Sequence, residues 1–224
     1  MDVVPPEMLQ EAKQPPPRDA KTANVAAAAS LIRGVRLCLP VVLLVSASLA
    51  STSLRDIDGH IHTVPLKPGF KATVLYFVTH DCPISNRYAP EIRRICHDYE
   101  PRGVRCLVAY VDPTVGTEEI REHLRQYGGS QPAIHDVDHE LVRLADATVT
   151  PESALFNETG ELVYLGRIDN LYAALGTPRR RATVSDLRDA LDEVLSAKQV
   201  SRPRAKAVGC YIPSLDVIQR GGLN

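Results

Sequence analysis

Cys82 stands where a strand-forming run at residues 72–79 gives way to a helical pattern that begins near Ser85. A thiol at such a junction faces the unpaired backbone N–H groups and the positive dipole end of the helix, and both favour the thiolate over the thiol. A thiolate is the reactive form in disulfide exchange, in peroxide reduction and in soft-metal binding. The position therefore predicts a reactive sulfur and leaves its reaction open.

The other cysteines carry weaker signals. Cys96 shares a predicted helix face with apolar residues and Cys106 lies inside a predicted buried strand, so both are interpreted as core packing, for which free cysteine is well suited. Cys210 lies in AVGCYIP, a short apolar patch within an otherwise polar tail. Cys38 belongs to the segment that precedes the predicted domain.

Apolar periodicity predicts the elements that must position Cys82. Alternating strands and helices indicate an α/β domain whose sheet carries helices on both faces, and this domain is assigned to residues 51–198. The tail, residues 199–224, has no clear periodicity and carries Cys210. The predicted elements are a hairpin within 54–66, strands at 72–79 and 104–111, helices at 85–100, 117–127 and 139–145, a second hairpin around 158–160, and a helix at 183–196.

The first fifty residues differ from the rest in composition. Residues 1–30 lack apolar periodicity and are interpreted as a disordered leader or the product of a mis-called start. In residues 31–50, basic residues precede a short apolar run with small residues at its end, a pattern typical of a signal peptide. The run is shorter than the roughly 20 residues that span a bilayer. Export to a periplasmic or extracellular location is therefore predicted. The alternatives are a buried helix and an uncleaved anchor, and only the uncleaved anchor would bring the protein to a membrane.

Charge and aromatic content exclude some functions. The chain has 26 basic and 27 acidic residues, for a net charge of −1, and neither half is dominated by one sign. No basic patch suggests nucleic acid as a partner. Tryptophan is absent and aromatic residues make up 5% of the chain, which argues against stacking platforms for sugars or single strands.

The chain resembles the thioredoxin-fold redoxin family, which includes proteins related to alkyl hydroperoxide reductase and thiol-specific antioxidant. The resemblance rests on Cys-Pro-Ile-Ser at 82–85, on Pro90 eight residues after the cysteine, and on Val-Thr-Pro at 149–151, which is similar to the family's cis-proline loop. The segment 157–169 is similar to the hairpin that closes the redoxin sheet. This resemblance implies a thioredoxin-like fold with a central mixed sheet and helices on both faces.

The resemblance also assigns roles at the site. It implies that Cys82 is the nucleophile, with Ser85 in place of the second cysteine of the redox motif, so that no disulfide forms within the motif itself. Thr150 and Pro151 would hold the substrate against the sulfur, which we expect to be reachable beside that loop. The isomer of the Thr150–Pro151 peptide bond is left open, because it depends on tertiary structure.

Other residues match the family in part. Tail cysteines resolve sulfenates in some peroxiredoxins, so the resemblance permits a disulfide between Cys82 and Cys210; a stray thiol or an intermolecular bridge is the alternative. Thr79 matches the threonine of the peroxiredoxin motif, whereas Leu75 replaces its proline. Arg167 would be the cation that peroxiredoxins place at the sulfur, or else a surface partner of Asp169.

These observations predict an exported thiol oxidoreductase that acts by disulfide exchange at Cys82. Its partners would be a protein disulfide or a peroxide and an unidentified thiol reductant, with no cofactor and no metal. The alternatives are a thiol peroxidase, a copper-handling module that uses Cys82 with His80 or His135, and an adaptor whose thiol is incidental.

Overall fold

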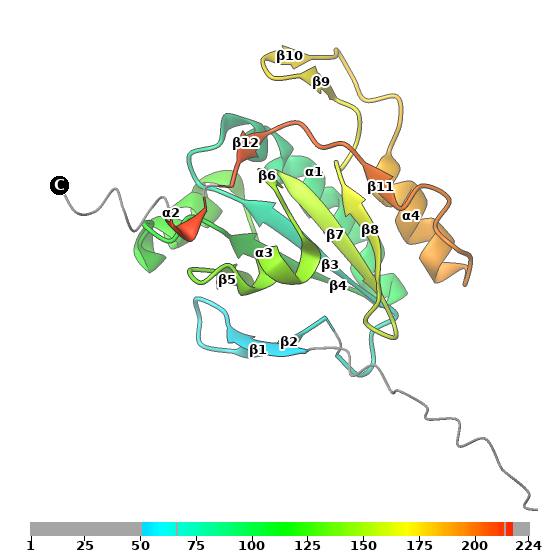
Figure 1. The fold of residues 1–224 in the computed structure, drawn as a ribbon, viewed down its shortest axis with the longest axis horizontal. Helices are drawn as coiled ribbons and strands as arrows, with labels where there is room; N and C mark the ends of the chain where they lie inside the picture. Colours follow the sequence, from blue (N-terminus) through cyan, green and yellow to red (C-terminus); the bar gives the residue numbers. More distant parts are fainter. Residues whose placement is uncertain (1–50, 66, 213, 217–224) are drawn as a thin grey trace, which may run out of the picture. The chain divides into compact units, whose positions relative to one another are not determined.

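The computed structural model describes residues 51–65, 67–212 and 214–216, so the predicted leader and signal peptide at residues 1–50, together with Cys38, lie outside the described residues. No helix in the described part is both long and apolar enough to cross a membrane. The elements, shown in Figure 1, are β1 (Thr52–Arg55), β2 (Ile61–Val64), β3 (Ala72–Val78), α1 (Pro83–Tyr99), a 3-10 turn (Glu100–Arg102), β4 (Val104–Tyr110), α2 (Thr117–Tyr127), β5 (Ala133–His135), α3 (Glu140–Ala145), β6 (Val149–Thr150), β7 (Glu152–Asn157), β8 (Leu162–Gly166), β9 (Tyr172–Ala174), β10 (Thr177–Pro178), α4 (Asp186–Leu195), β11 (Arg204–Ala205) and β12 (Cys210–Tyr211).

The central sheet has six strands in the order β11-β8-β7-β3-β4-β5. β3 pairs in parallel with β4 and antiparallel with β7, so it lies in the middle of a mixed sheet. Every residue of β3 and β4 is buried, as expected for strands covered on both faces. Burial on both faces explains why these two strands are continuous runs of β-branched and aromatic residues.

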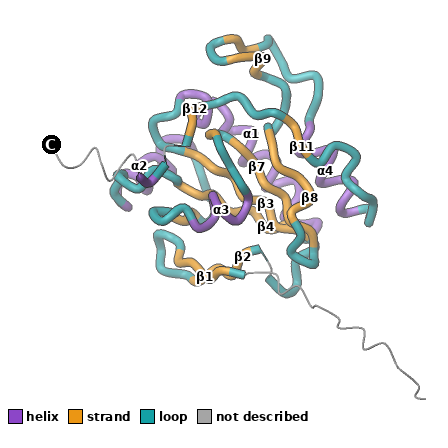
Figure 2. Tube along the Cα trace, in the orientation of Figure 1, coloured by secondary structure: helices purple, strands orange, loops and turns teal. Residues whose placement is uncertain are grey.

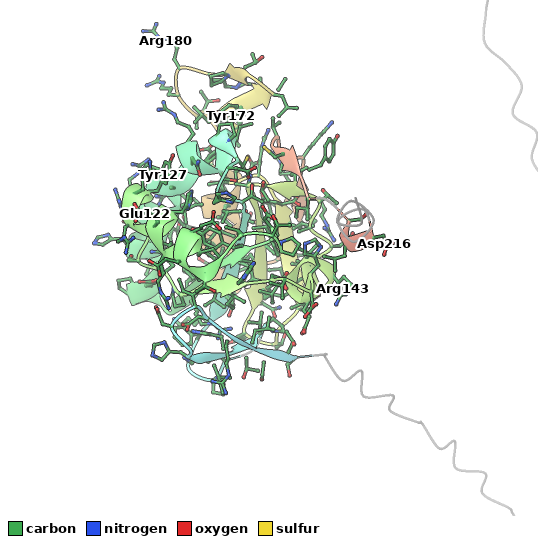
Figure 3. All side chains as sticks on the ribbon, turned by 90° about the vertical axis from the view of Figure 1, so that its left-hand side faces the viewer. Glu122, Tyr127, Arg143, Tyr172, Arg180 and Asp216 are labelled. Carbon is green, nitrogen blue, oxygen red and sulfur yellow. The ribbon has the colours of Figure 1, made fainter. Side chains whose placement is uncertain are left out.

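Two apolar clusters lie on opposite faces of the sheet. On one face, α1 and α4 pack through residues such as Ile92, Ile95 and Leu191. On the other face, α3 and the β1–β2 hairpin contribute Leu141, Ala145 and Val64. The prediction of a central mixed sheet with helices on both faces is confirmed. The β9–β10 hairpin projects from this body, and Figure 3 shows the Arg180 side chain directed outward beyond it.

The tail contains two strands that apolar periodicity did not predict. β11 extends the main sheet by pairing in parallel with β8, and β12 pairs antiparallel with β6. Between them the chain runs as a loop across the sheet end, from β11 to β12 (Figure 2). Residues 204–211 are therefore part of the folded domain, which extends beyond the boundary at residue 198 assigned from the sequence.

Helix boundaries differ from the prediction in one respect that bears on the site. α1 begins at Pro83, directly after Cys82, and not near Ser85. Proline suits a first helical position because its missing N–H would have no helical partner there. Cys82 is consequently the N-cap residue itself, which places its side chain at the open end of a helix of 17 residues.

Candidate active site

Cys82 lies at the positive end of α1. Its backbone is extended, with φ −75° and ψ 111°, and its carbonyl oxygen accepts the N–H of Asn86 at 3.0 Å. Its Sγ accepts the backbone N–H of Ser85 at 3.5 Å, the capping contact that serine or aspartate usually makes with oxygen. The sulfur therefore receives a backbone donor and the helix dipole, as the sequence predicted for a thiolate.

The loop at residues 149–151 borders the sulfur. The Thr150–Pro151 peptide bond is cis. The carbonyl oxygen of Thr150 lies 3.2 Å from the Cys82 Sγ and accepts its S–H when the thiol is protonated. Thr150 is fully buried, so this loop forms one wall of the site.

Cys210 also borders the sulfur of Cys82. Its Sγ lies 2.7 Å from the Cys82 Sγ, although the two residues are 128 positions apart in the chain. In the antiparallel pair of β12 with β6, Cys210 stands opposite Thr150, and the N–H of Ile212 donates to Thr148 at 3.0 Å. Backbone pairing of β12 with the prolyl loop thus holds the Cys210 sulfur next to the Cys82 sulfur. Both cysteines are recorded as free thiols.

Two glycines allow this close approach. A Cβ at Gly209 would overlap the carbonyl oxygen of Thr150 and lie 2.6 Å from its carbonyl carbon. A Cβ at Gly166, at the end of β8, would lie 2.8 Å from the backbone nitrogen of Ala205 in β11. Real Cβ atoms do not come this near to backbone atoms, so only glycine fits at either position. The tail is accommodated at two points by residues without side chains.

Further contacts secure the tail upstream of Cys210. Arg202 bonds to the Asp186 carboxylate at 2.8 Å, and the N–H of Ser201 donates to Glu193 at 2.9 Å, so both contacts join the tail to α4. In the parallel pair with β8, the N–H of Arg167 donates to Ala205 at 3.0 Å. These contacts limit the region that Cys210 can sample, which keeps its effective concentration at Cys82 high.

The expected accessibility of Cys82 is not observed. The residue is only 1% exposed, because the prolyl loop and the tail strand cover it. Cys210 is half-buried, and its neighbour Tyr211 is 82% exposed. The outward sulfur of the pair is therefore the one in the tail.

The pKa values of the two thiols are shifted in opposite directions. Burial acts to raise the pKa of Cys82, but hydrogen bonds from Cys210 and Ser85 outweigh it, and its pKa lies below the ordinary value. Burial, the hydrogen bond to Cys82 and the charges of Cys82 and Asp81 raise the pKa of Cys210 to about 12. The first proton to leave the pair is therefore that of Cys82, and the S–H of Cys210 then donates to the resulting thiolate.

This arrangement predicts how replacing Cys210 changes the acidity of Cys82. Cys210→Ala removes the S–H donor and should raise the pKa of Cys82, whereas Cys210→Ser retains a hydroxyl donor and should leave it low. The pH profile of Cys82 alkylation, localised by peptide mass spectrometry, measures the difference. Equal profiles for the two variants would show that Cys210 does not stabilise the thiolate.

The other residues that the sequence predicted for the site differ in whether they contact the Cys82 sulfur. Ser85 contacts the sulfur through its backbone N–H. Thr79, which matches the threonine of the peroxiredoxin motif, is buried after β3. Within the described residues, the hydrogen bonds of the Cys82 sulfur are with Ser85, Thr150 and Cys210.

Arg167 does not act as predicted. Its guanidinium bonds to Asp186 at 2.7 Å, not to Asp169, whose carboxylate instead accepts the Tyr88 hydroxyl at 2.6 Å. Arg167 lines a small recess together with Pro151, so it lies near the loop without contacting the sulfur.

The only group of three or more potential metal ligands found among the described residues does not include Cys82. Within the described ranges, the group with metal-binding spacing is Cys96, Glu100 and Cys106, whose donor atoms lie within 4.8 Å of one another. Hydrogen bonding to Cys96 and burial raise the pKa of Cys106, which opposes the thiolate that a metal requires. Cys96 and Cys106 are both buried in the α1 face of the core, consistent with the packing role predicted for them.

The histidines proposed for copper bind elsewhere. His135 contacts the carbonyl oxygen of Asp112 at 2.9 Å, and a ring nitrogen of His80 lies 4.0 Å from the Asp112 carboxylate. Both imidazoles therefore contact Asp112 and are not among the hydrogen-bond partners of the Cys82 sulfur in the described part of the chain.

Comparison with known proteins supports the architecture. No protein-family model matches the chain, and no curated protein matches it. Among solved structures, an uncharacterised conserved protein from Geobacillus kaustophilus is 24% identical, with 74% of this chain and 89% of that chain covered and a TM-score of 0.66. A hypothetical protein from Sinorhizobium meliloti is also 24% identical, with 73% and 91% covered and a TM-score of 0.63.

A third solved structure is a secreted disulfide oxidoreductase from Mycobacterium tuberculosis, 16% identical, with 65% and 95% covered and a TM-score of 0.46. At these identities the likeness is one of fold. The strand order itself agrees with the central mixed sheet with helices on both faces that the sequence predicted.

Proposed function

We propose that the protein is a thiol–disulfide oxidoreductase whose redox couple is Cys82 and Cys210. The observation that carries the proposal is the 2.7 Å separation of the two sulfurs. The two cysteines are 128 positions apart in the chain and are brought together by strand pairing. Two thiols held in contact, one with a lowered and one with a raised pKa, form a couple that can exchange two electrons.

The net reaction is reversible and balanced. When an external disulfide is reduced, it gains two electrons and two protons and becomes two thiols, while the thiols of Cys82 and Cys210 lose the same and become one disulfide. An external thiol reductant reverses the change. Exchange passes through a mixed disulfide between one protein sulfur and one external sulfur.

Redox equilibration with dithiol–disulfide buffers tests the proposal. The wild-type protein should form one intramolecular disulfide, mapped to the peptides that contain residues 82 and 210, and should catalyse reduction of a disulfide-bonded protein such as insulin. Cys82→Ser and Cys210→Ser should each abolish the disulfide. Cys96→Ser is the matched control and should leave it intact, because Cys96 lies in the core. Two free thiols at positions 82 and 210 under oxidising buffer would refute the couple.

Peroxide reduction has less support at this site. The cation assigned to it, Arg167, is paired with Asp186, and Cys210 occupies the space beside the Cys82 sulfur where a peroxide would have to bind. Export remains part of the proposal, supported by the apolar segment before residue 51. The N-terminal sequence of protein recovered from the producing cells would test it, since cleavage after Ala50 is expected.

A further inference from the structure

The two sulfurs of the couple differ in their access to solvent. Cys82 is 1% exposed, and it is enclosed by the Thr150 carbonyl at 3.2 Å, by the Ser85 N–H at 3.5 Å and by Cys210. Cys210 is half-buried on a short strand whose next residue, Tyr211, is 82% exposed. Of the two residues, only Cys210 is therefore partly exposed to solvent.

The direction of attack makes this difference decisive. A thiolate that breaks a disulfide approaches one sulfur from the side opposite the sulfur that leaves. For attack at Cys82 the leaving sulfur would be Cys210, so the approach would have to come from within the protein, where Cys82 is packed. For attack at Cys210 the leaving sulfur is Cys82, so the approach comes from the side of the half-buried Cys210 that faces away from Cys82.

We propose that external thiols exchange with the couple at Cys210, and that Cys82 exchanges only with Cys210. This inference rests on the proposed function and assigns the tail cysteine the outward role. The substrate class is a thiol, free or on a protein, that can bring its sulfur to the half-buried Cys210.

Each step balances. An external thiolate bonds to the Cys210 sulfur, the bond between Cys210 and Cys82 breaks, and its electron pair leaves on Cys82 as thiolate. A second external thiolate then attacks the external sulfur of the mixed disulfide and releases Cys210, which takes a proton. In reverse, the Cys82 thiolate attacks Cys210 in the mixed disulfide and expels the external thiolate.

The acidities agree with this order. A thiol of low pKa leaves faster, and the lowered pKa of Cys82 makes it the better leaving group of the two. The raised pKa of Cys210 makes it the poorer leaving group. Geometry and leaving-group quality thus direct the incoming thiolate to the same sulfur.

Trapping the mixed disulfide tests the assignment. The oxidised full chain is treated with reduced glutathione, quenched with acid at short times and mapped by peptide mass spectrometry. We expect glutathione on the peptide that contains Cys210 in about tenfold excess or more over the Cys82 peptide, because attack requires access. Equal labelling, or an excess on the Cys82 peptide, would overturn the inference.

A second measurement addresses opening of the tail. The rate of reduction by glutathione should stay nearly constant in urea below the unfolding transition, because Cys210 is reached without lifting β12. A steep increase with urea would mean that Cys82 is attacked after the tail detaches, and the inference would fail. Failure to form the disulfide at all would instead refute the proposed couple, so the two failures are distinguishable.

Discussion

Oxidation of the Cys82–Cys210 pair is expected to raise the free energy of unfolding by about 4 to 5 kcal/mol. The reason is the length of the loop that the bond would close: the two residues are 128 positions apart, and restricting so long a loop removes much conformational entropy from the unfolded chain. For a chain of this size, such a gain corresponds to an increase in melting temperature of roughly 10 to 20 °C.

Urea unfolding with and without a dithiol reductant measures this difference. Cys82→Ser and Cys210→Ser should each be as stable with reductant as without it, since neither can form the bond. Cys106→Ser supplies a contrasting control: it should be less stable than wild type because a polar hydroxyl replaces a core thiol, yet keep its dependence on reductant. Identical stability of oxidised and reduced wild-type protein would contradict the prediction.

Gly209→Ala is expected to detach β12 from the prolyl loop. The added Cβ would overlap the Thr150 carbonyl, a backbone group that cannot turn aside, so the strand must move. Overpacking of this kind costs about 1 to 3 kcal/mol. A loss of about 1.4 kcal/mol confined to tail docking increases the detached population tenfold.

The consequence should appear at the sulfur that the tail covers. In the reduced protein, alkylation of Cys82 should become about tenfold faster or more in Gly209→Ala, in proportion to the detached population. Gly129→Ala is the matched control, because its Cβ would meet chiefly the end of the flexible Leu124 side chain. Unchanged alkylation in Gly209→Ala, or an equal increase in Gly129→Ala, would show that tail docking does not limit access.

Local patterns were sufficient to predict most of the fold. β3 and β4 are continuous apolar runs and α1 is amphipathic. In each case the pattern of apolar and polar residues predicts both the type of element and which of its residues are buried. The position of Cys82 at a helix N-terminus follows from the junction of two such patterns. For the same reason Cys96 and Cys106 could be assigned to the core.

The tail could not be predicted in this way. β11 and β12 have two residues each, too few for a period-2 pattern, and they are fixed by partners far away in the chain. A weak signal was present: Gly209 directly precedes Cys210, as expected where one backbone lies against another. The cover over Cys82 and the pairing of Arg167 with Asp186 likewise depend on tertiary contacts that no local pattern encodes.

The order of the strands along the chain has a consequence for biosynthesis. β6 and β8, the partners of the two tail strands, both precede α4, so the ribosome completes them before β11 and β12 emerge. A nascent chain that has folded only as far as α4 has Cys82 covered by the prolyl loop but not by the tail, and no thiol lies beside it. Until β11 and β12 dock, that sulfur can form mixed disulfides with other chains. A protein truncated after α4 by a premature stop codon would remain in this state.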